Sequence, residues 1–389
     1  MVSGMGAVSA LGHNVPDMWE ALIAGRCGIG PLTRLDPARH RIKHAAQVSP
    51  LPDEANDSPT DPAIRFALMA GNEALDQAGV SVEQRGDVAL VLGTNFGAMS
   101  TTTQFLVNSS SASATQALHD DAVRIVAEKL GLHGIRSALS LSCASGNAAI
   151  GYAADLIRSG RAKMVLAGGY DAISKVVWAG LCSLRAMSPH ALRPFDRRRD
   201  GTIFGEGAGL LLLESAEHAH ARSTEFFGEF LGYATSSNAF HMTHPDEHGE
   251  GMARAMRGAL RDAEIDPTEV DHINAHGTGT PANDKLETAA IKTVFGKRAA
   301  TLPINGIKSM LGHAMGAASA LEAIATIMTI REGIIPPTIG LEEPDPECDL
   351  DYCALQARRA EVRVALNNSA GFGGCNAATI FARGEPDND

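Results

Sequence analysis

The stretch Cys143-Ala-Ser-Gly146 follows a strand-like run of residues, and it is predicted to open an alanine-rich helix. The stretch His313-Ala-Met-Gly316 repeats this arrangement about 170 residues later. In both, a glycine three positions after the reactive side chain lets the start of a helix pack tightly beneath it. The repeat predicts a duplicated unit in which each half presents one reactive side chain. A chance likeness between two glycine- and alanine-rich helices is the alternative.

Short apolar runs alternate with helical patterns along the chain, which is typical of a layered α/β fold. Several of these runs are apolar throughout, as strands buried on both faces are. The predicted strands span Val88–Gly93, Lys163–Gly168, Gly209–Glu214, Val270–Ala275, Thr301–Gly306, Arg363–Asn368 and Ala378–Ala382. The predicted helices span residues 62–78, 117–131, 144–159, 252–264, 284–295 and 313–332.

The composition is that of a compact folded protein. Of the 389 residues, 44% are hydrophobic and 20% are charged, which excludes a disordered chain. The formal net charge of −12 argues against a nucleic-acid-binding surface. No run of about 18 uncharged apolar residues predicts a membrane span, and no cleavage pattern predicts a secretory signal. The six scattered cysteines lack a CxxC pair and are typical of reduced thiols, so we expect a cytoplasmic enzyme.

Cys143 is the first candidate catalytic residue, because it is predicted to lie at a strand-to-helix junction. The unsatisfied N–H groups and the positive dipole end of a helix stabilise a thiolate at such a place. A thiolate is a nucleophile suited to forming a thioester. A small cysteine buried in the core is the alternative interpretation.

Two histidine motifs follow. Asn274-Ala-His276-Gly-Thr278-Gly-Thr280 comes after a predicted strand, where α/β proteins place working groups, and its threonines offer hydroxyls to an amide-bearing ligand. A turn whose histidine only caps structure is the alternative. His313 is expected to open a helix, whose positive end disfavours imidazolium and keeps a neutral N–H donor. Lys308 is expected to pair with Glu287, although such a pair can also be a solvated contact worth about 0–1 kcal/mol.

Two further stretches are candidates for a site. The glycine-rich stretch Gly371-Phe-Gly-Gly374 could present a backbone N–H to an oxyanion, or it could be a tight strand-to-strand turn. The stretch from His241 to His248 contains three histidines. A proline interrupts it and no cysteine or acidic triad supports it, so no metal site is expected.

In this order, these elements resemble the β-ketoacyl-acyl carrier protein synthases, specifically the elongating group with a Cys-His-His triad. The likeness runs from Gly4-Met-Gly-Ala-Val-Ser-Ala-Leu-Gly12 to Asn376. It also includes Leu166-Ala-Gly-Gly169, Arg193-Pro-Phe-Asp196, Arg199-Asp-Gly201 and Phe204-Gly-Glu-Gly207. The resemblance implies an α/β thiolase-type fold, with two pseudo-symmetric βαβ-rich halves in a layered αβαβα arrangement. The first half, residues 1–220, would carry the cysteine, and the second, residues 221–389, would carry both histidines.

The resemblance also implies a reaction, the decarboxylative Claisen condensation of an acyl chain with malonyl-acyl carrier protein. Cys143 would accept the acyl chain. His276 and His313 would donate hydrogen bonds to the malonyl thioester oxygen. Lys308 and Glu287 would be the supporting pair. No metal or redox cofactor is implied, because the phosphopantetheine arm arrives on the carrier protein.

Further roles follow from the same resemblance. The backbone N–H groups of Cys143 and Phe372 would form an oxyanion hole, and the Phe372 ring would gate the acyl pocket. Thr278 and Thr280 would bind the phosphopantetheine arm. The charges expected to dock the acyl carrier protein are those of Arg65, Arg197 and Arg198. The resemblance implies a homodimer, or a heterodimer with a cysteine-less partner subunit that sets chain length.

Two departures from the fatty-acid members favour a dedicated type II polyketide or polyene pathway. The stretch Gly97–Gly134 looks shorter and is rich in Ser and Thr, which predicts polar walls if it lines the acyl pocket. The predicted helix over residues 62–78 carries Arg65 as its one basic residue. Housekeeping fatty-acid elongation is the first alternative. A thiolase acting on coenzyme A esters, with Cys375 as a second catalytic cysteine, and a catalytically silent partner subunit are the others.

Overall fold

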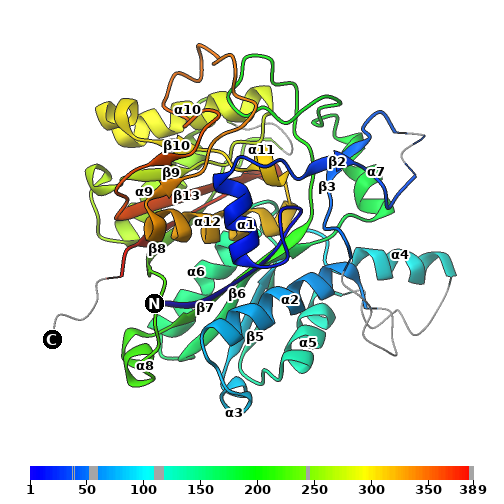
Figure 1. The fold of residues 1–389 in the computed structure, drawn as a ribbon, viewed down its shortest axis with the longest axis vertical. Coiled ribbons are helices and arrows are strands. Elements are labelled where there is room, and N and C mark those ends of the chain that lie inside the picture. The colour runs from blue at the N-terminus through cyan, green and yellow to red at the C-terminus, as the bar shows by residue number, and fades with distance from the viewer. Residues whose placement is uncertain (37, 39, 52–59, 109–117, 242–245, 385–389) are drawn as a thin grey trace.

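The computed structural model describes residues 1–36, 38, 40–51, 60–108, 118–241 and 246–384. Within these residues, two five-stranded sheets form the framework (Figure 1). In spatial order, the first sheet contains β1 (Val2–Val8), β7 (Gly207–Glu214), β6 (Met164–Asp171), β4 (Ala89–Gly93) and β5 (Arg136–Leu139). The second contains β8 (Glu229–Ser237), β14 (Cys375–Ala382), β13 (Val364–Gly371), β9 (His272–Asn274) and β10 (Ile304–Asn305).

The two sheets have the same strand directions. In the first, β6, β4 and β5 are parallel to one another, whereas β7 is antiparallel to both β6 and β1. In the second, β13, β9 and β10 are parallel, whereas β14 is antiparallel to both β13 and β8. This match confirms the predicted pseudo-symmetric halves. The exact division at residue 220 stays a prediction.

Two helices lie between the sheets, and others cover the outer faces (Figure 1). Helices α6 (Ser145–Arg158) and α12 (Ala318–Glu332) are the inner pair. The outer layers contain α2 (Pro62–Gln77) and α5 (His119–Leu130) on the first sheet, and α9 (Glu250–Asp262) and α10 (Pro281–Phe295) on the second. The layered αβαβα arrangement is therefore confirmed.

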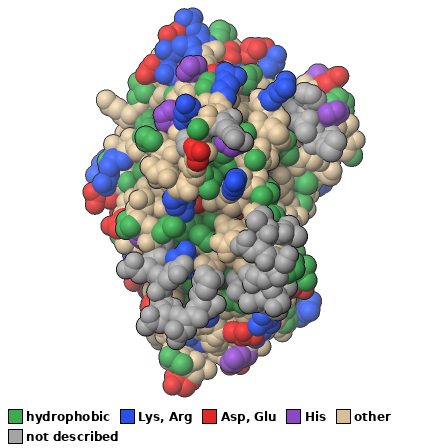
Figure 2. All heavy atoms as spheres, turned by 90° about the vertical axis from the view of Figure 1, so that its right-hand side faces the viewer, with side chains coloured by type: hydrophobic (Ala, Val, Ile, Leu, Met, Phe, Trp, Pro, Cys, Tyr) green, Lys and Arg blue, Asp and Glu red, His purple; other side chains and the backbone are tan. Residues whose placement is uncertain are grey.

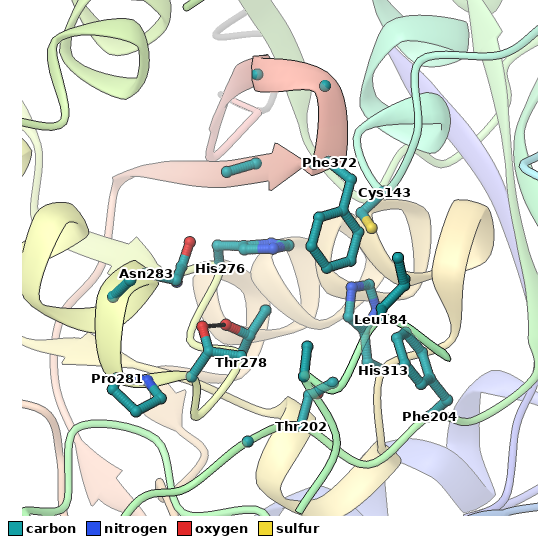
Figure 3. Close-up of a pocket in the computed structure, with 18 of the residues that line it drawn as sticks. Cys143, Leu184, Thr202, Phe204, His276, Thr278, Pro281, Asn283, His313 and Phe372 are labelled. Atoms are coloured by element: carbon teal, nitrogen blue, oxygen red, sulfur yellow. Dashed lines mark hydrogen bonds between the residues drawn. The ribbon is translucent and has the colours of Figure 1, made fainter. Parts of the chain in front are cut away.

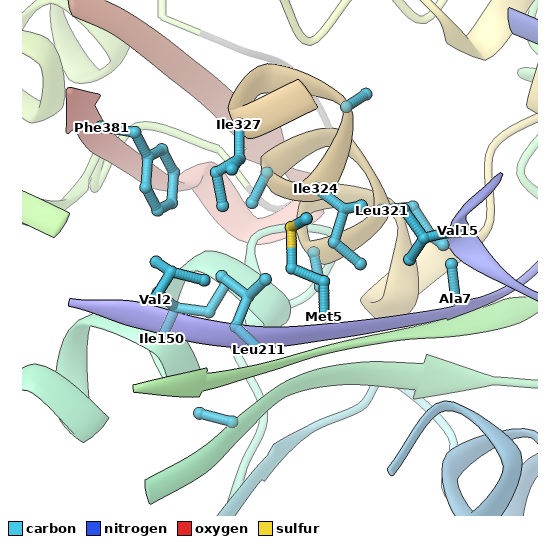
Figure 4. Packing of buried hydrophobic residues seen from close by; sticks show 14 of the residues in the cluster. Val2, Met5, Ala7, Val15, Ile150, Leu211, Leu321, Ile324, Ile327 and Phe381 are labelled. Atoms are coloured by element: carbon cyan, nitrogen blue, oxygen red, sulfur yellow. The ribbon is translucent and has the colours of Figure 1, made fainter. Parts of the chain in front are cut away.

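One hydrophobic core joins the two halves. Ile150 of α6 and Leu321 of α12 pack with Leu211 of the first sheet and Phe381 of the second (Figure 4). These side chains are all buried. Because α6 and α12 follow Cys143 and His313 in the chain, the core that unites the sheets also fixes the starting points of both reactive segments.

The other elements complete the layers. They are α1 (Val15–Ile23), α3 (Val82–Arg85), α4 (Met99–Asn108), α7 (Lys175–Ser183), α8 (Ala216–Ala221), α11 (Lys308–Leu311) and the two-stranded pairs β2 (Ile29–Pro31) with β3 (His44–Ala46) and β11 (Ile334–Ile335) with β12 (Arg358–Arg359). Among the helices of the described residues, none is long and apolar enough to span a membrane.

Strand β1 is not among the predicted strands, because two glycines interrupt its apolar pattern. The structure shows why glycine is needed at Gly6. A Cβ atom built there would lie 1.9 Å from the carbonyl oxygen of Ala70 on α2. The strand and the helix therefore approach each other so closely that no side chain fits at Gly6. The glycines that this packing needs are also what hides the buried strand in the sequence pattern.

We predict that Gly6→Ala lowers the free energy of unfolding by about 1–3 kcal/mol, the usual effect of overpacking a well-packed core. Gly30→Ala is the matched control, because a Cβ atom there meets nothing within 4 Å. Urea denaturation measures both variants, and equal stability of the two would contradict the close packing of β1 against α2.

Candidate active site

A cavity of about 650 Å³ is lined by residues of both halves and contains most of the predicted site residues (Figure 3). The predicted residues that line it are Cys143, His276, Thr278, Thr280, His313 and Phe372. Lys308 and Glu287 are buried and contact the His276 loop. Cys375 is half-buried and does not line the cavity.

A strained turn presents Cys143 between β5 and α6. Ser142 has a φ of 51°, a left-handed conformation that a non-glycine residue adopts at a cost and mainly at functional sites. The Ser145 hydroxyl secures this turn by donating to the Ser142 carbonyl at 2.6 Å. From the other half, the Ser369 hydroxyl of β13 donates to the Cys143 carbonyl at 3.1 Å. Cys143 is therefore held by residues of both halves.

The resting state of Cys143 differs from the predicted thiolate. The side chain is 3% exposed, and burial raises the pKa of its thiol to about 11, although the Lys308 charge and hydrogen bonds from the Ser142 and Asn95 side chains oppose this. The prediction of a thiolate stabilised by the helix N-terminus is thus wrong for the free protein. Burial could not be read from the local sequence, and the thiol must lose its proton as it attacks.

Acidic side chains of α10 fix the loop that carries His276. The Glu287 carboxylate accepts hydrogen bonds from the backbone N–H groups of His276 at 2.7 Å and Gly277 at 2.9 Å. It also accepts one from the Asn368 side chain at 2.6 Å. Further along the loop, Asp284 accepts from the Gly279 N–H at 3.2 Å. Because α10 follows the loop directly, its first turns reach back and hold the histidine backbone.

The predicted pair of Lys308 with Glu287 is not formed. Lys308 forms its ion pair with Glu322 of α12, and both side chains are buried. The ammonium also donates to the His276 carbonyl at 2.6 Å and to His276 Nδ1 at 3.2 Å. These three acceptors, all in the described part of the chain, use the three N–H donors of the ammonium. Glu287 instead holds the backbone of His276.

These contacts determine the tautomers of both histidines. An ammonium can only donate, so Nδ1 of His276 accepts, and the neutral ring carries its proton on Nε2. The backbone N–H of Met315 donates to Nδ1 of His313 at 3.2 Å, which places that proton on Nε2 as well. Burial and the nearby Lys308 charge hold the pKa of both imidazoles well below the usual value. Each histidine is therefore a neutral N–H donor.

The neutral state of His313 has a different cause from the predicted one. His313 lies between α11 and a short 3-10 turn (Met315–Ala317), and α12 begins only at Ala318. A helix N-terminus at His313 is therefore not the reason. Its backbone N–H donates to the Ile203 carbonyl at 2.8 Å, and its ring stacks on Phe204 with centroids 5.3 Å apart.

The two imidazole rings meet nearly at right angles. Their centroids are 5.5 Å apart and their planes are inclined by 87°. Figure 3 shows both rings extending toward the space beside Cys143 and Phe372. The site thus combines a buried thiol with two neutral donors in one cavity, an arrangement suited to stabilising negative charge on a thioester oxygen.

Sequence analysis missed Glu322 because nothing local marks it. It lies in the middle of an apolar helix, nine positions after His313, and its role depends on how α12 packs. A buried acidic residue in an otherwise apolar helix was the one available signal. The Phe204 ring was also missed, although its motif was part of the resemblance.

The predicted docking charges lie outside the cavity lining. Arg197 pairs with Glu343, and Arg198 pairs with Glu342 at 2.6 Å. Arg65 is partly buried on α2. Basic and acidic side chains lie next to one another at the upper end of the face shown in Figure 2. A docking role for the three arginines stays a prediction.

The stretch Gly97–Gly134 does not line the cavity as far as it is described. On α4, the hydroxyls of Thr102 and Thr103 donate to carbonyls of their own helix at 2.9 and 2.7 Å. The serines at residues 109–111 lie outside the described residues. Across the described chain, no three His, Cys, Asp or Glu side chains gather as they would around a metal ion.

Comparisons with known proteins agree over nearly the whole chain. Residues 1–219 match the family described as "Beta-ketoacyl synthase, N-terminal domain", and residues 227–342 match "Beta-ketoacyl synthase, C-terminal domain". The chain is 38% identical to a 3-oxoacyl-[acyl-carrier-protein] synthase 2 of Synechocystis sp. (strain ATCC 27184 / PCC 6803 / Kazusa), over 98% of this chain and 97% of that protein.

Solved structures are also similar to this chain over nearly its whole length. One is described as "The ishigamide ketosynthase/chain length factor", with a TM-score of 0.92 and 38% identity over 99% of this chain and 98% of that one. Another is the AntDE:AntF complex, described as a type II polyketide acyl-carrier protein with its ketosynthase bound to the hexaketide. Its TM-score is 0.92 with 32% identity, again over 99% and 98% of the two chains.

We predict that Lys308 is strongly coupled to Glu322 and weakly to Glu287. In double-mutant cycles of unfolding free energy, Lys308→Met with Glu322→Gln should show a coupling of about 2–3 kcal/mol, near the upper end for contacting residues. Lys308→Met with Glu287→Gln should show less than about 1 kcal/mol. A larger coupling free energy for Lys308 with Glu287 than with Glu322 would contradict the ion pair seen here and support the pair predicted from the sequence.

Proposed function

The chain belongs to the β-ketoacyl synthase family, and from that premise we propose that Cys143, His276 and His313 carry out its reaction. The protein is a β-ketoacyl-acyl carrier protein synthase, which condenses an acyl chain with malonyl-acyl carrier protein and releases carbon dioxide. The observation that carries the residue assignment is the cavity in which two neutral Nε2–H donors lie beside one buried thiol.

The first half-reaction loads the acyl chain. The Cys143 sulfur attacks the carbonyl carbon of an acyl thioester on the carrier protein, and the phosphopantetheine thiol leaves. The proton lost by Cys143 is taken up by the departing thiolate, so charge is conserved overall. The backbone N–H groups of Cys143 and Phe372 are the proposed donors to the tetrahedral oxyanion.

The second half-reaction forms the new bond. Malonyl-acyl carrier protein loses carbon dioxide, and the electron pair of the broken C–C bond forms an enolate. The Nε2–H groups of His276 and His313 donate to the enolate oxygen, where the negative charge develops. The enolate carbon then attacks the acyl-Cys143 carbonyl, and the Cys143 sulfur leaves as a thiolate that takes up a proton from solvent water. Because the broken C–C bond supplies the electrons, we propose that no metal or redox cofactor takes part.

We propose that the cavity receives the phosphopantetheine arm of a carrier protein. Thr278 and Thr280 line the cavity, and their hydroxyls lie 3.0 Å apart. We assign them to the amides of the phosphopantetheine arm. Phe372 is 36% exposed in the short turn after β13, so its ring can swing without unpacking the core. We assign it as the gate between the arm and the acyl pocket.

The partners proposed are an acyl carrier protein and a second subunit. Among the described residues, strand β5 forms an edge of the first sheet and is only partly buried, so this edge can accept a strand of another chain. That chain would be a second copy or a cysteine-less subunit that sets chain length. Likeness to a type II polyketide ketosynthase supports a polyketide pathway, and housekeeping fatty-acid elongation is the alternative that the 3-oxoacyl-[acyl-carrier-protein] synthase 2 supports.

We predict that the cysteine and the histidines separate into two half-reactions. Cys143→Ala should abolish acylation. His276→Ala and His313→Ala should still be acylated at Cys143, because neither ring forms the proposed acyl oxyanion hole. Malonyl decarboxylation should fall by about 10²–10³-fold in each histidine variant, the scale for losing one oxyanion donor.

The assay combines acyl- and malonyl-carrier protein with each variant, and follows the intact mass of the Cys143 peptide and of the products. Wild-type decarboxylation by either histidine variant would remove that histidine from the mechanism. Acylation of another cysteine in place of Cys143 in the wild-type protein would show that Cys143 is not the nucleophile.

The pathway is tested with matched substrates. A rigid polyenoyl chain loses fewer rotamers on binding than a saturated one, so its kcat/KM should be the larger at equal length. The comparison is made with the enzyme alone and with a cysteine-less homologue added. Equal or faster turnover of the saturated chain under both conditions would assign the protein to ordinary fatty-acid elongation.

A further inference from the structure

A buried carboxylate at the end of β6 receives hydrogen bonds from two different turns. Asp171 is fully buried. Within the described residues, four donors reach it: the Thr94 hydroxyl at 2.7 Å, and the backbone N–H groups of Asn95 at 2.9 Å, Phe96 at 3.0 Å and Gly316 at 2.7 Å. A carboxylate buried in the core needs such donors, because an unsatisfied one is strongly unfavourable there.

The donors come from opposite halves of the molecule. Thr94, Asn95 and Phe96 form the turn after β4, whereas Gly316 lies in the turn between His313 and α12. The second turn lies very close to the carboxylate. A Cβ atom on Gly316 would lie 2.7 Å from Asp171 Oδ2 and 2.8 Å from the Asn95 nitrogen. The carboxylate therefore ties together two turns that the chain brings from distant positions.

Each turn leads directly to a reacting group. From the first, the Thr94 carbonyl accepts a hydrogen bond from the Ser145 hydroxyl at 3.5 Å, and Ser145 secures the turn that presents Cys143. In the second, Met315 precedes Gly316 and donates its N–H to His313 Nδ1 at 3.2 Å. The β4 turn thus supports the turn that carries the nucleophile, and the His313 turn sets the tautomer of a histidine.

We propose that Asp171 is a positioning residue that fixes Cys143 and His313 relative to each other. Both carboxylate oxygens of Asp171 accept hydrogen bonds from the β4 turn, and Oδ2 also accepts one from the His313 turn. A shift of either turn alone would therefore break hydrogen bonds to Asp171. This inference rests on the proposed roles of Cys143 and His313. Asp171 touches no substrate, and its effect passes through the two groups it positions.

The first test is Asp171→Asn. The amide keeps the size of the side chain but turns an acceptor oxygen into an NH2 group that faces N–H donors. The turnover number for condensation should fall by about 10–10²-fold, the scale of a displacement of about 1 Å in a catalytic group. The KM for malonyl-carrier protein should change little, because Asp171 does not line the cavity.

Asp61→Asn is the matched control. Asp61 is also a buried carboxylate of the first half, and it accepts from the N–H groups of Ala63 and Thr101 at 2.9 and 2.8 Å. Its donors belong to α2 and α4 and not to either of the two turns that Asp171 holds. This variant should keep the wild-type turnover number, and a matching loss in it would show that any buried carboxylate in this half has the same effect.

The pH profile separates positioning from simple destabilisation. Burial raises the pKa of Asp171 to about 6, with the four donors opposing. The titratable groups that interact with it are the Tyr170 hydroxyl and the Cys143 thiol, both kept neutral because burial raises their pKa. Protonation weakens the acceptor, so wild-type turnover should fall below about pH 6. The ratio of wild-type to Asp171→Asn turnover should therefore shrink as the pH falls, because Asp284 and Glu322 titrate equally in both proteins.

The outcomes are distinguishable. A wild-type protein that is not acylated at Cys143 would overturn the proposed function and this inference with it. An acylated wild type with an unchanged Asp171→Asn turnover number would overturn the inference alone. If Asp171→Asn does not fold, Gly316→Ala presses on the same contact from the other side. That variant should lower decarboxylation at least 10-fold, about the scale of a misplaced catalytic group, and an unchanged rate would overturn the inference.

Discussion

The buried ammonium of Lys308 is the constraint on which the site depends. It has three donors, and Glu322 and two atoms of His276 accept them. Because it can only donate, it fixes the tautomer of His276. Because it is charged, it helps to lower the pKa of both imidazoles and opposes the rise that burial causes in the pKa of Cys143. A charge this deeply buried needs a partner, and only the packing of α12 between the sheets brings Glu322 to it.

The duplicated fold explains why the reacting groups meet. The sheets share one strand order and one set of strand directions, so their corresponding strand ends face a common region. Cys143 lies just before α6, which begins at Ser145, and His313 lies five residues before the start of α12 at Ala318. The two inner helices share one core. His276 comes from the loop after β9, the counterpart of the β4 turn that Asp171 holds. Residues far apart in sequence thus converge because the two halves are copies of one arrangement.

Local patterns in the sequence predicted the features that depend on local structure. Runs such as Val88–Gly93 and the helix over residues 62–78 appear nearly as predicted, and Cys143, His276 and His313 line one cavity. Several failures involve contacts between distant segments. Glu322 replaces Glu287 as the partner of Lys308 because of how α12 packs. Burial reverses the expected ionisation of Cys143, and the close approach of α2 explains the glycine at Gly6 in a strand that was not predicted.

The central claim is that His276 and His313 are neutral rings protonated on Nε2. Nitrogen NMR of protein labelled with ¹⁵N-histidine measures this directly, with the two residues assigned from single His→Gln variants. At pH 7, both rings should show the Nε2–H tautomer, and neither should titrate near pH 6.5, the ordinary histidine value. An imidazolium at pH 7, or an Nδ1–H tautomer on either ring, would contradict the account.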